Sequence, residues 1–241
     1  MNLFKPALSY DDVLLRPQFS DIESRSEVSL ASELDENNRF ELPIIASPMD
    51  TVVESDMAIA LARLGALGVI HRYNNILDQK RMVWTVSRNV PNKPRAAAIA
   101  ITGDFVDRAQ MLAEAGIDIL CVDVAHGHHI MMKNALSTLK RNLPDNIHIM
   151  AGNVATRKGY EDLAEWGADS VRIGIGGGSI CSTRVQTGHG IPTFQSVLDC
   201  SESECAGEVP IIADGGIKTS GDIVKALGAG ADFVMVGSLF S

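Results

Sequence analysis

The chain has 241 residues, 46% hydrophobic and 21% charged, with a formal net charge of −9, as expected for a globular protein of one large or two small domains. This net negative charge gives no support for a surface that binds nucleic acid or an anionic membrane. It does not exclude a phosphate ligand, which would be held locally. No apolar run reaches membrane-span length, and Met1-Asn-Leu-Phe-Lys5 lacks a signal-peptide layout. We therefore expect a cytoplasmic protein with no nucleic-acid or membrane partner.

In chain order, residues 1–40 predict an N-terminal arm in which Asp35-Glu-Asn-Asn38 is typical of a hairpin turn. Beyond it, short β-branched runs alternate with amphipathic segments. The predicted strands are Leu42–Ala46, Ala66–Ile70, Arg95–Ile101, Asp118–Asp123, His148–Ala151, Ser170–Ile173, Pro210–Ala213 and Phe233–Val236. The predicted helices include Ser55–Leu64, Asp104–Ala115, His129–Asn142, Arg157–Trp166 and Ser220–Leu227.

This alternation indicates βα units with right-handed crossovers and a parallel sheet. A glycine of a Gly-Ala-Asp type motif ends a helix just before several strands, as at Gly167-Ala-Asp169 and Gly230-Ala-Asp232. Eight evenly spaced strands favour a closed (β/α)8 barrel, the TIM-barrel fold, in one domain covering residues 1–241. The sequence stops at Ser241, directly after the eighth predicted strand, so we expect the last helix to be missing.

Polar residues follow the predicted strands, where barrels place their chemistry. Glycine-rich turns follow the seventh and eighth strands, the usual phosphate-binding position, and Ser179 could add a hydroxyl from the sixth loop. The alternative is that these glycines only make tight turns. The strand-end segments are Ser47-Pro-Met-Asp50, His71-Arg72, Asp123-Val-Ala-His126, Gly152-Asn153, the loop from Gly174, Asp214-Gly-Gly216 and Gly237-Ser238.

Asp123 ends an otherwise apolar strand, so its carboxylate needs a partner or a ligand. It could bind a ribose diol, as acidic residues at strand ends do in dinucleotide sites, or it could cap the helix that begins near His128. The nearby His126, His128 and His129 lack a zinc spacing and are interpreted as surface or supporting side chains.

Cys181 lies in a glycine-rich loop, Gly174-Ile-Gly-Gly-Gly-Ser-Ile-Cys181, and could be a buried spacer, a disulfide half or a nucleophile. Arg184 could favour its thiolate and Thr183 could relay a proton. By contrast, Cys121 and Cys200 lie in apolar patterns that predict burial, and Cys205 lies in a polar stretch that predicts exposure.

The sequence resembles the IMP dehydrogenase/GMP reductase family along its whole length. The motifs that carry the resemblance are Tyr10-Asp-Asp-Val-Leu-Leu15, Ser47-Pro-Met-Asp-Thr-Val52, Asp123-Val-Ala-His-Gly-His128, Ala151-Gly-Asn-Val-Ala-Thr156, the loop 174–184, Ala213-Asp-Gly-Gly-Ile217 and Met235-Val-Gly-Ser238. The resemblance implies that Cys181 attacks C2 of a purine nucleotide and that Thr183 works beside it.

The resemblance also implies the ligand sets. The nucleotide set is Ser47, Met49, Asn153, Ser179, Asp214, Gly215, Gly216, Gly237 and Ser238. The cofactor set is Asp123, Gly174, Ile175 and Gly176, for NAD or alternatively NADPH. Backbone carbonyls of Gly176, Gly178 and Cys181 would hold potassium, and the family's homotetramer is the implied assembly.

Three departures from the family pattern bear on the expected activity. Only residues 72–94 separate His71 from the third strand, so the regulatory modules that most dehydrogenases carry there are not expected. Gly177 stands where many relatives have proline. The family's barrel also continues past residue 241, where the dehydrogenase flap and the reductase's acidic partner would lie. We favour an IMP dehydrogenase, with a GMP reductase, or a non-catalytic nucleotide-binding or assembly subunit, as the alternatives.

Overall fold

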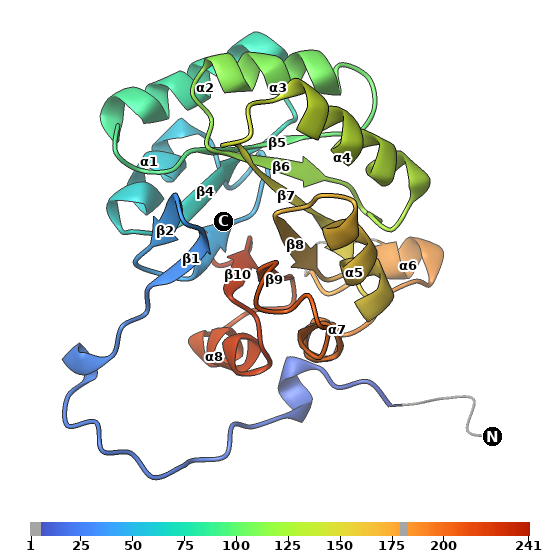
Figure 1. Cartoon of the computed structure of the whole chain (residues 1–241). Helices are drawn as coiled ribbons and strands as arrows, with labels where there is room; N and C mark the ends of the chain where they lie inside the picture. The colour runs from blue at the N-terminus through green and yellow to red at the C-terminus, as the bar shows by residue number, and fades with distance from the viewer. Residues whose placement is uncertain (1–5, 179–182) are drawn as a thin grey trace.

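The computed structural model describes residues 6–178 and 183–241. Eight parallel strands close into a barrel in the order β10-β3-β4-β5-β6-β7-β8-β9, with helices around the outside (Figure 1). The predicted (β/α)8 barrel is therefore confirmed. The strands are β3 Ile44–Ala46, β4 Leu67–Ile70, β5 Ala96–Ile99, β6 Ile119–Asp123, β7 His148–Val154, β8 Ser170–Ile173, β9 Ile211–Asp214 and β10 Phe233–Val236.

Helices connect successive strands, and side-chain caps fix several of their starts. Asn75, Thr156 and Thr219 each accept a hydrogen bond from a backbone N–H in the first helical turn, which satisfies a donor that has no partner inside the helix. The helices are α1 Ser55–Arg63, α2 Ile76–Asn89, α3 Phe105–Glu114, α4 Ile130–Asn142, α5 Arg157–Glu165, α6 Thr183–Thr187, α7 Thr193–Ser201 and α8 Ser220–Gly228.

The barrel interior is built from alternate residues of the strands. Because neighbouring side chains of a strand point to opposite faces, one set faces the axis and the other packs against the helices. The axial cluster is Ile45, Leu67, Val69, Ala96, Ala98, Ile119, Cys121, Met150, Ile212, Phe233 and Met235, joined by Leu34 and Phe40 from the N-terminal region. Burying each large apolar side chain contributes roughly 1.5–3 kcal/mol.

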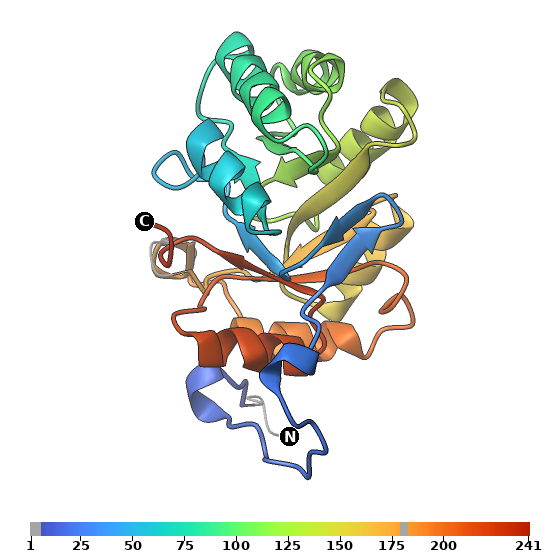
Figure 2. The same ribbon diagram turned by 90° about the vertical axis from the view of Figure 1, so that its left-hand side faces the viewer.

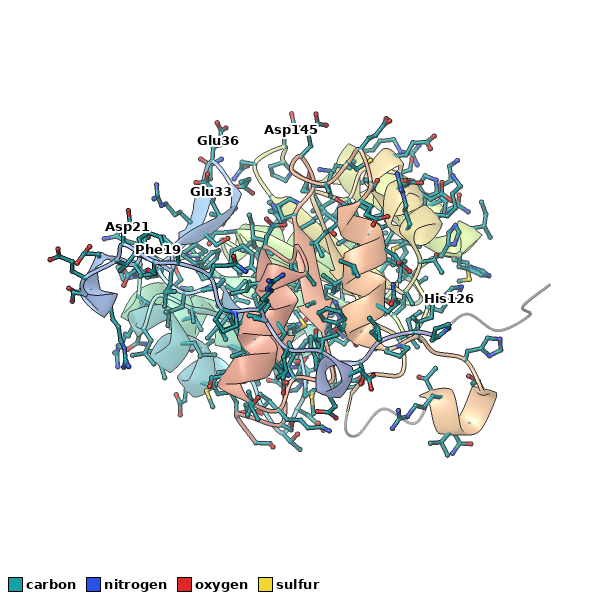
Figure 3. All side chains as sticks on the ribbon, turned by 90° about the horizontal axis from the view of Figure 1, so that it is seen from below. Phe19, Asp21, Glu33, Glu36, His126 and Asp145 are labelled. Carbon is teal, nitrogen blue, oxygen red and sulfur yellow. The ribbon has the colours of Figure 1, made fainter. Side chains whose placement is uncertain are left out.

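A hairpin closes the N-terminal end of this barrel. Strands β1 Ser32–Asp35 and β2 Asn38–Phe40 pair antiparallel, which confirms the predicted turn. The ring of Phe40 packs edge-on against Phe233 with centroids 5.6 Å apart. The hairpin and the C-terminus lie on opposite sides of the barrel (Figure 2). Glu36 in its turn lies at the same end of the molecule as Asp145, away from His126 (Figure 3).

Asp35 fastens the hairpin to the barrel through a buried histidine. Its Oδ2 lies 2.6 Å from Nδ1 of His148, whose Nε2 lies 2.8 Å from Oγ of Ser170. Burial alone would raise the pKa of Asp35. Hydrogen bonds from His148, Asn38 and the Asn37 backbone outweigh burial, so the pKa lies well below its usual range. Ionised Asp35 therefore stabilises the fold above the ordinary aspartate pKa, and this contribution is lost as the pH falls through the lowered value.

The change Asp35→Asn is expected to lower the free energy of unfolding by about 1–3 kcal/mol at neutral pH, because it weakens a charge-assisted bond to a buried partner. Urea unfolding checks this, and the deficit should shrink in acid. The control is Glu36→Gln, which removes an exposed carboxylate from the same turn. An equal loss in both variants would contradict the assignment.

The N-terminal arm also contacts the barrel at residues that precede the hairpin. The 3-10 helix η1 Tyr10–Asp12 lies against α8, where Lys225 Nζ donates to the Tyr10 carbonyl at 2.8 Å. A second short helix, η2, spans Arg25–Glu27. In the described part of the chain, no helix combines the length and apolarity needed to cross a bilayer.

Candidate active site

A cavity of about 200 Å³ lies at the C-terminal end of the barrel, where four connections meet. The loop after β3 contributes Ser47 and Met49, the loop after β8 contributes Gly178, and the turns after β9 and β10 complete the wall. Seven of the nine residues predicted to bind nucleotide line this one cavity: Ser47, Met49, Asp214, Gly215, Gly216, Gly237 and Ser238. The strand ends thus bring together residues that are up to 191 positions apart in the sequence.

The turns after β9 and β10 need glycine for two different reasons. Gly215 and Gly216 have φ angles of +92° and +79°, which L side chains rarely adopt. A Cβ on Gly237 would instead come 2.9 Å from Sδ of Met49. Their backbone N–H groups can therefore approach a bound anion closely, and α8 begins shortly after the first turn. The arrangement suits a phosphate group.

Asp214 ends β9 beside this cavity. Asn153 Nδ2 donates to Asp214 Oδ2 and to the Gly174 carbonyl, both at 2.8 Å. Burial raises the pKa of the Asp214 carboxyl, and the opposing effects of the Arg172 charge and the Asn153 hydrogen bond only partly offset it.

The strand β7 reaches Val154, so Asn153 lies within it and not after it as predicted. Its side chain touches the Asp214 carboxylate and lies outside the cavity-lining set.

Arg172 was not among the predicted site residues, yet it joins both predicted ligand sets. Its Nη2 donates to Asp123 Oδ1 at 2.6 Å, its Nε donates to Asn153 Oδ1 at 3.0 Å, and the same Nε lies 3.7 Å from Asp214 Oδ2. Arg172 is buried, with 2% of the residue exposed. The sequence of β8 could have indicated this, because strand alternation places the polar side chains of Ser170 and Arg172 on the axial face of the barrel.

Asp123 has two cationic partners and caps no helix. Besides Arg172, Arg72 Nε donates to Asp123 Oδ2 at 3.3 Å. Burial raises the pKa of Asp123, but the charges of the two arginines and their hydrogen bonds outweigh this and lower it overall. Helix α4 is capped by His129, so the alternative that Asp123 caps this helix is wrong. The carboxylate stays ionised at the end of β6.

Arg172→Met is expected to lower the free energy of unfolding by about 3–5 kcal/mol, because two half-buried carboxylates, each with 19% of the side chain exposed, lose their shared buried cation. Thermal and urea unfolding measure the loss. The matched control is Arg172→Lys, which keeps the charge but lacks the forked donors, and it should lie between wild type and Arg172→Met. A Met variant as stable as wild type would show that the network contributes nothing.

The three cysteines other than Cys181 differ in their exposure to solvent. Cys121 lies on the barrel axis, 2.9 Å from Arg172 Nη1, and burial raises its pKa to about 11. Burial likewise raises the pKa of Cys200, in α7, to about 12. Both are buried, as predicted. Cys205 is half-buried, so its predicted exposure is wrong, because the turn after α7 packs it against the core.

A second cavity, of about 590 Å³, adjoins the first across the loop that follows β8. Ile175, Gly176 and Gly178 line it together with Arg184 and Thr193. Gly174, next to them, admits no side chain, since a Cβ there would lie 1.9 Å from the Asp214 carbonyl oxygen. Thr183 begins α6. The predicted Ser179 and Cys181 lie outside the described residues.

The three histidines after β6 have supporting positions. His128 Nε2 lies 2.7 Å from Asp162 Oδ2, and its ring lies 5.9 Å from the ring of Trp166. His129 Nδ1 accepts from the Met131 N–H at 3.1 Å. His126 is exposed, and nearby histidine charges add to burial in lowering its pKa. These observations agree with the surface and supporting interpretation.

Fold and site together define a parallel β/α barrel with a glycine-lined cavity and an Asp–Arg network at the C-terminal end of its strands. Residues 7–241 match the model of the IMP dehydrogenase / GMP reductase domain. The chain belongs to this family.

Curated relatives carry both activities in their names. The chain is 36% identical to an inosine-5'-monophosphate dehydrogenase of Cryptosporidium parvum, over 97% of this chain and 68% of the relative. It is 32% identical to one of Nitrosopumilus maritimus, over 98% of this chain and 75% of the relative. It is 39% identical to a GMP reductase of Buchnera aphidicola subsp. Baizongia pistaciae, over 97% of this chain and 68% of the relative.

Proposed function

We propose that the protein is an IMP dehydrogenase, converting IMP, NAD and water into XMP and NADH through a covalent bond at Cys181. The observation that carries the proposal is the convergence of Ser47, Met49 and the β9 and β10 turns on one cavity. Backbone N–H groups of Gly216, Gly237 and Ser238 would hold the phosphate, with Ser179 adding its hydroxyl. The Asp214 carboxylate would accept from the ribose hydroxyls.

The reaction that we propose starts with the thiolate of Cys181 adding to C2 of the purine, with Thr183 beside it. A hydride then leaves C2, and water hydrolyses the resulting thioimidate to release XMP and the thiol. NAD supplies the hydride acceptor. Asp123, kept ionised by Arg72 and Arg172, would bind the nicotinamide ribose, and Gly174 to Gly176 would line the same side.

We propose that the loop after β8 holds a potassium ion. Carbonyl oxygens are ligands of hard cations, and a Cβ on Gly176 would lie 3.2 Å from Cβ of Arg184 and 3.4 Å from the His189 carbonyl oxygen. The carbonyls of Gly176, Gly178 and Cys181 would hold the ion and shape the loop. Assembly into a homotetramer is part of the same proposal.

GMP reductase is the second candidate, in which the same cysteine displaces ammonia from GMP and NADPH supplies the hydride that yields IMP. The connection from β4 to β5 supports it, because residues 72–94 hold only α2. A nucleotide-binding subunit without turnover is the third candidate.

Two measurements separate these candidates. Turnover is assayed with IMP and NAD and, separately, with GMP and NADPH, and we expect activity with the first pair. Activity with the second pair alone would assign the reductase. Thermal shifts with IMP, GMP and XMP identify a binding subunit, which would be stabilised by a nucleotide without turning it over. A chain that none of these nucleotides stabilises would contradict the proposed function.

A further inference from the structure

The hydroxyl of Thr193 lies where the β8 loop meets the end of β9. Thr193 is the first residue of α7 and is 3% exposed. Its Oγ1 donates to the Asp214 carbonyl at 3.5 Å, and a Cβ built on Gly174 would lie 3.3 Å from Oγ1. A Cβ built on Gly177 would lie only 2.2 Å from the same oxygen. This one hydroxyl therefore fills the space beside two glycines of the loop.

Gly177 is required for its size and not for its backbone conformation. Its φ lies outside the left-handed region that Gly174, Gly176, Gly215 and Gly216 occupy. Apart from Oγ1, the nearest atoms to its added Cβ are Thr193 Cβ and the Gly215 carbonyl carbon, both at the ordinary contact distance of 3.5 Å. The Thr193 hydroxyl alone thus excludes a side chain at position 177.

The same segment also touches the β9–α8 turn. A Cβ on Gly215 would lie 2.9 Å from the Gly178 nitrogen, and one on Gly216 would lie 3.3 Å from the Gly177 carbonyl oxygen. Gly178, Gly215 and Gly216 are all walls of the nucleotide cavity. Any displacement of Gly177 by Thr193 therefore moves a cavity wall.

The start of α7 is itself anchored, so Thr193 cannot easily retreat. The Ile191 N–H donates to the Ile175 carbonyl at 3.2 Å, and the Gln195 N–H donates to the Leu8 carbonyl at 3.1 Å. These bonds fix the chain on both sides of Thr193. Closely packed interiors respond to an extra methyl group by shifting the softer partner, which here is the glycine segment.

We infer that Thr193 is a positioning residue whose hydroxyl sets the path of Gly177–Gly178 and thereby the shape of the nucleotide cavity. The inference rests on the proposed function, because it assigns the cavity to a purine nucleotide. It predicts that the effect of a methyl group at position 177 depends on the shape of residue 193. Thr193 lies beside the loop glycines and does not line the cavity assigned to the nucleotide.

The test introduces Gly177→Ala into three full-length backgrounds and measures IMP affinity by calorimetry. With Thr193 present, affinity should fall by about tenfold or more, because the added methyl overpacks the site. In the Thr193→Ala background the same change should cost less than about threefold, since only ordinary contacts remain. The matched control is Thr193→Val, which keeps the shape without the hydroxyl, and there the large loss should persist.

Stability measured on the same variants separates a structural contact from a positioning role. Coupling between positions 177 and 193 in the free energy of unfolding, with IMP affinity unchanged, would overturn the inference. Equal losses of affinity in the Ala and Val backgrounds would also overturn it. Failure of the proposed function is visible elsewhere, as a wild-type chain that binds no purine nucleotide.

Discussion

Cys181→Ser is expected to reduce turnover by at least about 10³-fold while leaving IMP affinity within a few-fold of wild type. A serine hydroxyl is a far weaker nucleophile than a thiolate at neutral pH, and removing a nucleophile has effects of this size in other covalent enzymes. In the proposed mechanism the side chain adds to the purine only during the reaction, so ground-state binding through the phosphate and ribose should remain. Steady-state kinetics and calorimetry together measure both quantities.

The control for this prediction is Cys205→Ser, a half-buried cysteine in the turn after α7. It should leave turnover unchanged within about twofold, because surface and turn substitutions away from the site have small effects. Substantial residual turnover in Cys181→Ser would contradict a covalent mechanism at that residue. A Cys181→Ser variant that no longer binds IMP would indicate a role in ground-state binding instead.

Asp214→Asn is expected to weaken IMP affinity about 10- to 100-fold, since hydrogen bonds to a charged acceptor each contribute roughly 1.5–3 kcal/mol. The free energy of unfolding of this variant should not fall. Burial raises the pKa of Asp214, so its ionised form lowers the free energy of unfolding at every pH above the ordinary aspartate value. The neutral amide avoids this cost, and urea unfolding at neutral pH should give an unchanged or higher stability.

The same carboxylate should make nucleotide binding depend on pH. In the wild type, IMP affinity should fall as the pH drops through the raised pKa of Asp214, because the protonated carboxyl loses an acceptor for the ribose hydroxyls. In Asp214→Asn this part of the pH dependence should vanish. A variant that binds IMP as tightly as wild type would show that Asp214 does not touch the ribose.

The fold could be predicted because its signals are local. Strand–helix alternation and the Gly-Ala-Asp entries are visible in short windows, and the eight strands were found within a few residues. Helices α2 and α7 were not among the predicted helices. In α7 the buried face includes Thr193, Ser196 and Cys200, so it lacks a plain apolar stripe. Helix α2 buries Gln79 while Leu77 and Trp84 are more than half exposed, which blurs the same signal.

The site could be predicted only in part, for a physical reason. Glycines and acidic residues at strand ends are recognisable singly, and seven predicted residues do line one cavity. Arg172 depends on partners from three other strands, β6, β7 and β9, and the sequence does not show which residues it meets. The fit between Gly177 and Thr193 likewise depends on close packing between residues that are 16 positions apart in the sequence.

The central claim is that this barrel binds a purine nucleotide beside a reactive Cys181. The most direct test is peptide mapping after brief iodoacetamide treatment, with and without saturating IMP. We expect Cys181 to be alkylated first and to be protected by IMP, while Cys121 and Cys200 stay unlabelled because burial raises their pKa values to about 11 and 12. Faster labelling of Cys205, with no effect of IMP at Cys181, would contradict it.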